Sequence, residues 1–335
     1  GDFTTAVGSN AMTDGVHYAS TAVGYNALGR SSTWYPYYNT AVGNNAGDNV
    51  YYGDYLVIIG NNSDVASTGY TQSIAIGHQS LISGNYSVSV GTSASSSPNG
   101  QSDHCTFIGQ NAGFDIDGGD YCTFVGSNAG YAGGTGNDNT TVGVDSLHEL
   151  TSGQKNSSLG RKSLRNVTSG YENSAFGNDA GYSVSTGIKN TLIGNQAGQK
   201  QGVSTTNALT TGSNVTCVGF QSMPSSGTAT NEIVLGDANI SSLRCNVQTI
   251  SSLSDERDKT SIADLTYGLD FINDMRPVEF TWNRRDGSLG AKPDMGFIAQ
   301  ELHYVYNQAV DGIPFGDVKK SPMTVNPTNL IPLAI

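Results

Sequence analysis

One short motif recurs along residues 1–240 and limits what this chain can fold into. It reads Thr-Ala-Val-Gly-x-Asn-Ala-Gly/Leu, and the spacing between successive central glycines is most often 17 residues. These glycines are Gly8, Gly24, Gly43, Gly60, Gly77, Gly91, Gly109, Gly126, Gly143, Gly160, Gly177, Gly194, Gly219 and Gly236. A fixed short period is typical of a solenoid or fibre, in which each repeat buries its surface only against its neighbours. The repeat therefore argues against a single α/β enzyme domain or a helix bundle.

The columns of the repeat predict the structure of one coil. An apolar residue directly precedes each glycine (Val23, Ile193). In most copies Thr or Ser stands two residues before that apolar residue, and Ala or Ser often follows three residues after the glycine (Ala46, Ala112). Because alternate residues of an extended chain share a face, we expect these three positions to point together into the core. The glycine permits a positive φ or a close backbone approach at a corner, and the Asn two residues later suits a turn. Each repeat is predicted to be a short strand, a glycine corner, a second short strand and a loop.

A coil this thin raises the question of how its core is closed. One large apolar residue and an alanine bury too little surface to offset the ordering of the backbone. We therefore expect three chains to share the core about a long axis, with like side chains stacked roughly 4.8 Å apart. The pattern leaves open whether a roll closes within one chain or by interlocking three.

Composition and charge exclude several classes of partner. Of the 43 glycines, 37 lie in residues 1–240, where only 3 of the 9 prolines occur. The net charge is −12, and residues 1–150 hold twelve acidic side chains and one basic side chain, Arg30. Such a surface repels nucleic acid and anionic lipid, and the chain has no run of about 18 apolar residues for membrane insertion. The first residues are already mid-repeat, so we expect further sequence, and other tail proteins, upstream of Gly1.

Two of the four cysteines fall on the repeat. Cys105 and Cys122 are 17 residues apart, so they should stack on adjacent coils as small buried thiols. Four cysteines do not make a disulfide scaffold in a chain of this length. No CxxC pair or histidine at ligand spacing supports a metal site on them.

Three copies of the repeat carry a resemblance to known fibres. The segments NTAVGNNAG (39–47), CTFVGSNAG (122–130) and NTLIGNQAG (190–198) resemble the head repeats of trimeric adhesins and phage tail fibres. That resemblance implies a mainly β fibre, either a parallel β-roll or an interlocked β-prism, in a homotrimer.

The repeat ends before the last part of the chain. Apolar residues at i, i+4 and i+7 predict a short helix over 265–272, which should end before Pro277. Strands are predicted over 278–282 and 295–298, followed by a helix over 299–306. The chain thus divides into a shaft (1–240), a linker (241–253) and a small α+β domain (254–335).

Three motifs in this last domain resemble one family. They are SDERDK (254–259), RPVEFTW (276–282) and GFIAQEL (296–302), and in this order they resemble the self-cleaving intramolecular chaperone domain of phage tailspikes and endosialidases. The resemblance implies that Ser254 and Lys259 are catalytic and that the chain is cut between Leu253 and Ser254. It also implies a long final helix, which would begin within 325–334.

The proposed pair has a physical rationale. A serine hydroxyl is a weak nucleophile and needs a base, and a lysine serves as that base only when it is neutral. Neighbouring acids such as Asp255 and Asp258 favour the charged ammonium, so trimer assembly could change this balance and couple cleavage to folding. The alternative is structural, with Ser254 as a helix N-cap and the acids in the first turn.

Two further candidate sites lie on the shaft. Alternating carboxylates at Asp115, Asp117 and Asp120, among glycines, are the pattern of a calcium loop, although a solvated acidic corner has the same composition. No other cofactor is expected. Aromatic side chains that could stack on sugar rings, or cover coil edges instead, gather in the neighbouring loops: Trp34, Tyr35, Tyr37, Tyr38, Tyr51 and Tyr52.

These observations favour one function over two alternatives. The chain is predicted to be the receptor-binding shaft of a virion tail fibre, with host cell-surface glycan or protein and other copies of itself as partners. Its C-terminal domain would direct trimerisation and then cut itself off. The alternatives are a tailspike that degrades polysaccharide and a cellular trimeric adhesin; the shaft shows no paired carboxylates at glycosidase spacing that would favour the first.

Overall fold

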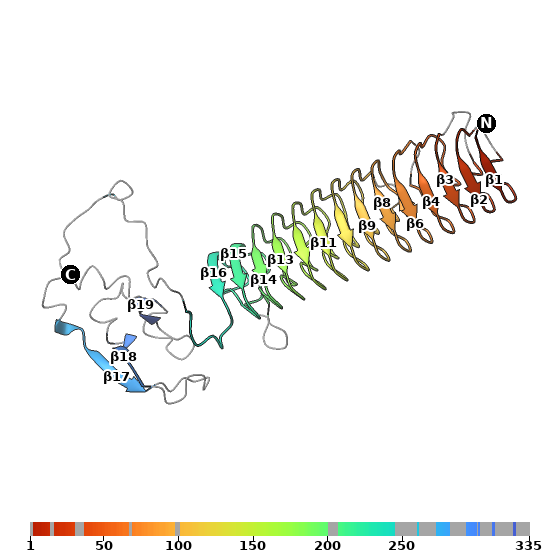
Figure 1. The fold of residues 1–335 in the computed structure, drawn as a ribbon. Helices are drawn as coiled ribbons and strands as arrows, with labels where there is room; N and C mark the ends of the chain where they lie inside the picture. Colours follow the sequence, from red (N-terminus) through yellow and green to blue (C-terminus); the bar gives the residue numbers. More distant parts are fainter. Residues whose placement is uncertain are drawn as a thin grey trace. The chain divides into compact units, whose positions relative to one another are not determined.

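The computed structural model contains two compact units, residues 1–238 and residues 239–335. It describes residues 3–13, 17–30, 37–66, 69–97, 101–199, 207–244, 260, 273–281, 293–299, 301, 310–311 and 324–325. Figure 1 shows the first unit as a row of stacked coils, with one strand of each coil aligned along the same side.

A fourteen-stranded parallel sheet runs along the first unit. Its strands are β1 (Thr5–Val7), β2 (Thr21–Val23), β3 (Thr40–Val42), β4 (Val57–Ile59), β6 (Ile74–Ile76), β8 (Val88–Val90), β9 (Thr106–Ile108), β10 (Thr123–Val125), β11 (Thr140–Val142), β12 (Ser157–Leu159), β13 (Ser174–Phe176), β14 (Thr191–Ile193), β15 (Ser213–Val218) and β16 (Thr230–Leu235). Each strand pairs with its counterpart in the next coil, so that Thr123 lies opposite Thr140 and Val125 opposite Val142. The predicted class, a mainly β parallel roll, is confirmed.

Three small sheets complete the described structure. Within the first unit, β5 (Asp64–Val65) pairs in parallel with β7 (Leu81–Ile82). In the second unit, β17 (Pro277–Thr281) pairs antiparallel with β18 (Pro293–Phe297), and β19 (Val310–Asp311) with β20 (Thr324–Val325). The two strands predicted over 278–282 and 295–298 are thus confirmed to within two residues. Ala299 and Glu301 are helical as predicted, whereas the helix predicted over 265–272 lies outside the described residues.

The glycine column forms a corner, as predicted. Gly126 has a φ of +137°, and a Cβ there would lie 2.5 Å from the carbonyl oxygen of Gly143 in the next coil. Only glycine allows both this conformation and this approach. Two residues later the chain turns through the left-handed region, with φ of 54° at both Asn111 and Asn128, which is why Asn and Asp suit this column.

The predicted core face was wrong in part. In the three-residue strands after β1 the middle residue points inward, as at Ala22, Phe124 and Leu192, all fully buried, whereas Ile193 before the glycine is 42% exposed. Ala112, three residues after a glycine, is nevertheless buried. The alternation of an extended chain does not continue across the corner, because the glycine and the left-handed residue after it are not extended. The core is also closed within one chain, so three chains are not needed to enclose it.

Two columns fill this interior by matching large side chains with small ones. Where the middle strand residue is large, as at Phe107, the residue six positions later is Gly113, and a Cβ on Gly113 would lie 2.7 Å from the Phe107 ring. Where the strand residue is small, as at Ser158, the later position can hold a buried leucine, Leu164. The small residue Ala175 is instead followed by Gly181, where a Cβ would lie 2.7 Å from leucines of the two neighbouring coils. The choice between Gly and Leu at the end of the motif therefore depends on the side chains of the same coil and of its neighbours.

The core residues form two separate hydrophobic clusters. One draws on residues between 11 and 82, and the other on residues between 105 and 234. Between them the interior is lined by buried serines: Ser83, Ser87, Ser89, Ser95, Ser97 and Ser102. This section begins within the 14-residue interval between Gly77 and Gly91, the shortest spacing in the repeat, and continues into the next coil.

A buried polar column lies just before the strands. Asn139, Asn156, Asn173 and Asn190 stack on one another, and each side-chain amide also donates to a glycine carbonyl, as Asn156 does to Gly170 at 2.9 Å. The Asn156 oxygen in turn accepts from the backbone and the amide of Asn173. These bonds satisfy buried polar groups that would otherwise destabilise the fold.

Candidate functional site

The second and third C-terminal motifs come together as one hairpin-like pair of strands. The pairing of β17 with β18 places Val278 opposite Gly296 and Glu279 opposite Met295. Arg276, at the start of one motif, forms an ion pair with Glu301 of the other, in which its Nε donates to Oε2 at 3.0 Å and its Nη2 donates to Oε1. Hydrogen bonding from Arg276 lowers the pKa of Glu301, so the carboxylate stays ionised.

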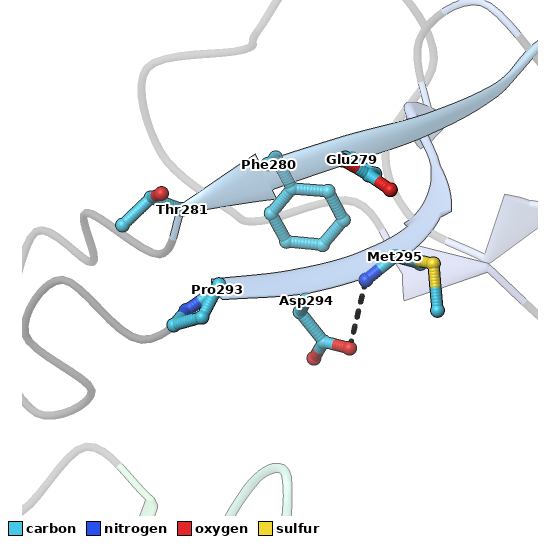
Figure 2. A pocket seen from close by; sticks show the side chains of 6 residues that line it. All are labelled: Glu279, Phe280, Thr281, Pro293, Asp294 and Met295. Atoms are coloured by element: carbon cyan, nitrogen blue, oxygen red, sulfur yellow. Dashed lines mark hydrogen bonds between the residues drawn. The ribbon is translucent and has the colours of Figure 1, made fainter.

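A pocket of about 510 Å³ lies on this strand pair. In the view of Figure 2 the Phe280 ring lies between the two strands, with Glu279 on the same strand and Asp294 on the facing strand. The lining residues are Glu279, Phe280, Thr281, Pro293, Asp294 and Met295. The Asp294 side chain accepts a bond from the Met295 backbone N–H at 2.9 Å. This lining offers acidic groups and one hydroxyl but no basic side chain, so by itself it supplies no Ser–Lys pair.

The predicted catalytic residues lie outside the described residues. Leu253, Ser254 and Lys259 all fall in the segment 251–259, and their geometry is therefore not part of the site described above. The Ser–Lys pair and the cleavage junction stay predictions from the sequence.

The aromatic residues predicted to bind sugars are stacked on one another. Trp34 and Tyr35 lie outside the described residues, but Tyr37 stacks on Tyr18 with centroids 5.3 Å apart, and Tyr38 on Tyr55 with centroids 5.0 Å apart. Tyr51 is half-buried and Tyr52 is 47% exposed. Stacking covers one face of each ring in these pairs, and Tyr38 and Tyr55 are nevertheless each 54% exposed.

Two longer stacks were not predicted. Tyr86, His104 and Tyr121 form one, with neighbouring centroids 4.9 and 5.1 Å apart. Phe114, Tyr131 and His148 form another, with centroids 5.0 and 4.9 Å apart. The signal was present in the sequence, because these rings recur at spacings of 17 or 18 residues and so fall on the same column of successive coils.

The acidic corner does not gather its carboxylates. The backbone N–H groups of Asp115 and Asp117 donate to Tyr131 and Gly134 of the next coil, while the Asp120 side chain accepts a bond from the backbone of Asp103 at 2.8 Å. Across the part of the chain that the structure describes, no three His, Cys, Asp or Glu side chains are grouped as metal ligands. Asp115, Asp117 and Asp120 are therefore close in sequence, but their side chains do not form such a group.

The cysteine column is confirmed as a pair of stacked thiols. Cys105 and Cys122 are buried free cysteines, and the Cys122 backbone N–H donates to the Cys105 sulfur at 3.3 Å. The contact with the Cys122 thiol and burial both raise the pKa of Cys105. Burial raises the pKa of Cys217 to about 11. Cys105 and Cys217 are therefore protonated at neutral pH and act as packing groups.

Comparison with known proteins found a similarity within the second unit. Residues 254–311 match the family described as chaperone of endosialidase, which agrees with the three motifs. This match and the parallel β-solenoid that precedes it fit a phage tail-fibre or endosialidase-type protein. No curated protein matched the chain. Among the described residues, no helix has the length and apolarity to cross a membrane.

Proposed function

We propose that this chain is the trimeric shaft of a virion tail fibre, assembled by its own C-terminal domain. One observation carries the proposal: the match to the chaperone of endosialidase begins at residue 254, shortly after the last described coil of the solenoid. The shaft, residues 1–240, would bind the host surface, and residues 254–335 would bring three chains into register. A chaperone for assembly suits a repetitive fibre, because a shift by one whole repeat preserves every column and offers near-equal wrong registers.

The domain then removes itself by cutting before Ser254. In this proposal the Ser254 hydroxyl attacks the carbonyl carbon of Leu253, and Lys259 in its neutral form accepts the hydroxyl proton. The peptide C–N bond breaks, the Ser254 amino group takes up a proton, and water hydrolyses the resulting ester. Loss of the chaperone makes assembly irreversible, because the mature shaft no longer carries the domain that could guide refolding.

Host recognition is assigned to the aromatic columns. The exposed edges and hydroxyl groups of Tyr38 and Tyr55 form a row at the side of the shaft, and Tyr86 and Tyr121 continue such a row further along. Tyrosine hydroxyl groups that recur along the column, with His104 between Tyr86 and Tyr121, suit a polymeric ligand with repeated polar groups, such as a cell-surface glycan. Because stacking covers one face of each ring, this recognition would rest on hydrogen bonds to the tyrosine hydroxyl groups more than on stacking against sugar rings.

Cleavage is tested by following the intact chain. The wild-type protein should release a fragment whose first residue is Ser254, identified by mass spectrometry. Ser254→Ala should stay uncut yet assemble, and Lys259→Arg should also stay uncut, because an arginine keeps the charge but cannot serve as a base. Ser252→Ala is the matched control and should be cut as the wild type is. Cleavage of Ser254→Ala at the wild-type rate would overturn the assignment.

A further inference from the structure

The outer face of the long sheet carries an unbroken line of apolar side chains. These are the residues that precede the corner glycines, and we call them the outer stripe. Its members are Val7, Val23, Val42, Ile59, Ile76, Val90, Ile108, Val125, Val142, Leu159, Phe176, Ile193, Val218 and Leu235. Each of the fourteen strands contributes one residue, so the stripe extends for roughly 60 Å at about 4.8 Å per strand.

The stripe is open to solvent in the single chain. Leu159, Phe176 and Ile193 lie opposite one another on β12, β13 and β14, and they are 48%, 44% and 42% exposed. The corner glycines and the in-register pairing hold them in one row. Monomeric soluble proteins rarely expose contiguous apolar patches larger than a few hundred Å², and larger ones mark interaction sites.

The two outward-facing columns of the sheet contain no charged side chain. Two residues before each stripe position stands Thr, Ser, Val or Ile, as at Thr140, Ser157 and Ile233. Neither column contains a charged side chain in any of the fourteen strands, although the chain has a net charge of −12. Two copies of this chain could therefore meet on this face without the repulsion that their net charge would cause elsewhere.

We propose that the outer stripe is the surface on which copies of this chain pack against one another, with three sheets facing a common axis. The inference rests on the trimer of the proposed function and names the face that makes it. A partner for the whole stripe needs apolar groups that repeat at the strand spacing over its full length. Another copy of the same chain has the same repeat period because its sequence is identical. If the copies pack in parallel and in register, each coil contacts the corresponding coil of its neighbours.

This arrangement also accounts for a feature of the repeat that folding of one chain leaves unexplained. The core of each coil is filled by the middle strand residue and the loop residues, so the residue before the glycine is not needed to fill the core of its own chain. It is apolar in all fourteen strands nonetheless. Contact with the same residue of neighbouring copies supplies the reason, because burial of a half-exposed valine or leucine stabilises an interface.

The test compares two aromatic positions of equal exposure. Phe176 belongs to the stripe and is 44% exposed, whereas Tyr171 lies in a loop outside the sheet and is 41% exposed. Light scattering of the full chain should give a trimer for the wild type and for Tyr171→Lys. Phe176→Lys should dissociate at a concentration at least tenfold higher than wild type, with an unchanged circular dichroism spectrum. If Phe176→Lys is as stable a trimer as Tyr171→Lys, the assignment is overturned.

A second measurement does not depend on weakening the assembly. Leu159→Cys and Tyr171→Cys are treated with a short bismaleimide, and the wild type gives the background from the natural cysteines. Leu159→Cys should be linked between chains and Tyr171→Cys should not; linkage of Tyr171→Cys alone would place another face at the axis. If Phe176→Lys fails to fold, the crosslinking of Leu159→Cys still tests whether the outer stripe is the interface. A wild-type protein that is monomeric would instead overturn the proposed trimer itself.

Discussion

Gly126 lies so close to Gly143 in the next coil that a methyl group on Gly126 would sit 2.5 Å from the Gly143 carbonyl oxygen. Gly126 also has a φ of +137°, a conformation that other residues rarely adopt. The same relationship joins the corner glycines of the neighbouring coils. The spacing between coils is thus set by backbone contacts at the corner as well as by the sheet.

Gly126→Ala should therefore strongly destabilise the shaft. The left-handed backbone costs about 1–2 kcal/mol, and the overlap with Gly143 adds to it, so we expect a loss of at least about 3 kcal/mol in the free energy of unfolding. Gly69→Ala is the control, because Gly69 has a φ of +93° with nothing within 4 Å of an added Cβ. It should cost only the backbone strain. Denaturant unfolding of both variants measures the difference, and equal losses would contradict the close-contact explanation.

The matching of large and small core residues predicts a compensating pair. Phe107→Ala should cost about 3–5 kcal/mol through the cavity it leaves, and Gly113→Leu alone should destabilise by overlap with the Phe107 ring. Together they recreate the natural pair Ala22 and Leu28, both buried. The double variant should be more stable than the sum of the single changes by at least about 1 kcal/mol, measured as a double-mutant cycle. If the stability losses of the two single variants simply add in the double variant, the two positions are not matched in size.

The serine section offers two positions that should respond in opposite directions. The buried Ser89 Oγ has no hydrogen-bond partner among the described residues, so Ser89→Ala should leave stability unchanged or raise it by about 1 kcal/mol. Ser87 Oγ donates to the Ser102 carbonyl at 2.9 Å and accepts from the Cys105 backbone at 3.2 Å. Ser87→Ala should destabilise by about 1–3 kcal/mol. Thermal unfolding of the two variants tests this, and a larger loss for Ser89→Ala would contradict it.

Asp64 should make stability fall as pH rises through a defined window. Burial raises its pKa from 3.8 to about 6, although it accepts bonds from the backbones of Val65 and Asn49. The folded state therefore holds the proton more tightly than the unfolded chain. Asp64 therefore contributes about 3 kcal/mol to the free energy of unfolding below pH 3.8. This contribution is lost as the pH rises from 3.8 to about 6.

Asp64→Asn should remove that part of the pH dependence. Denaturant unfolding at pH 4 and pH 7 gives the change in stability for the wild type and for the variant, and the difference between those changes isolates Asp64. Asp117→Asn, at an exposed loop position, should follow the wild type. A wild-type profile in Asp64→Asn would show that another group is responsible.

Much of the architecture could be predicted because it repeats. The glycine corners, the left-handed Asn positions and the stacked pair Cys105 and Cys122 all follow from a period that places like residues in adjacent coils. The aromatic stacks through His104 and His148 were missed although the same period contains them. In the C-terminal unit, two strands followed from local patterns, whereas the ion pair between Arg276 and Glu301 depends on a pairing between segments far apart in sequence.

The sequence by itself determined that this chain is a parallel β-fibre followed by a domain similar to the chaperone of endosialidase, since the repeat period, the motif order and the glycine positions can be read without the fold. Only the tertiary structure decided which face of the strands is enclosed. Alternation shows that Val125 and Thr123 share a face, but not that Phe124 is the buried one. The choice depends on how the chain turns at Gly126 and on whether Gly130 leaves room for the Phe124 ring, and these are relations between residues that meet only when the coil closes.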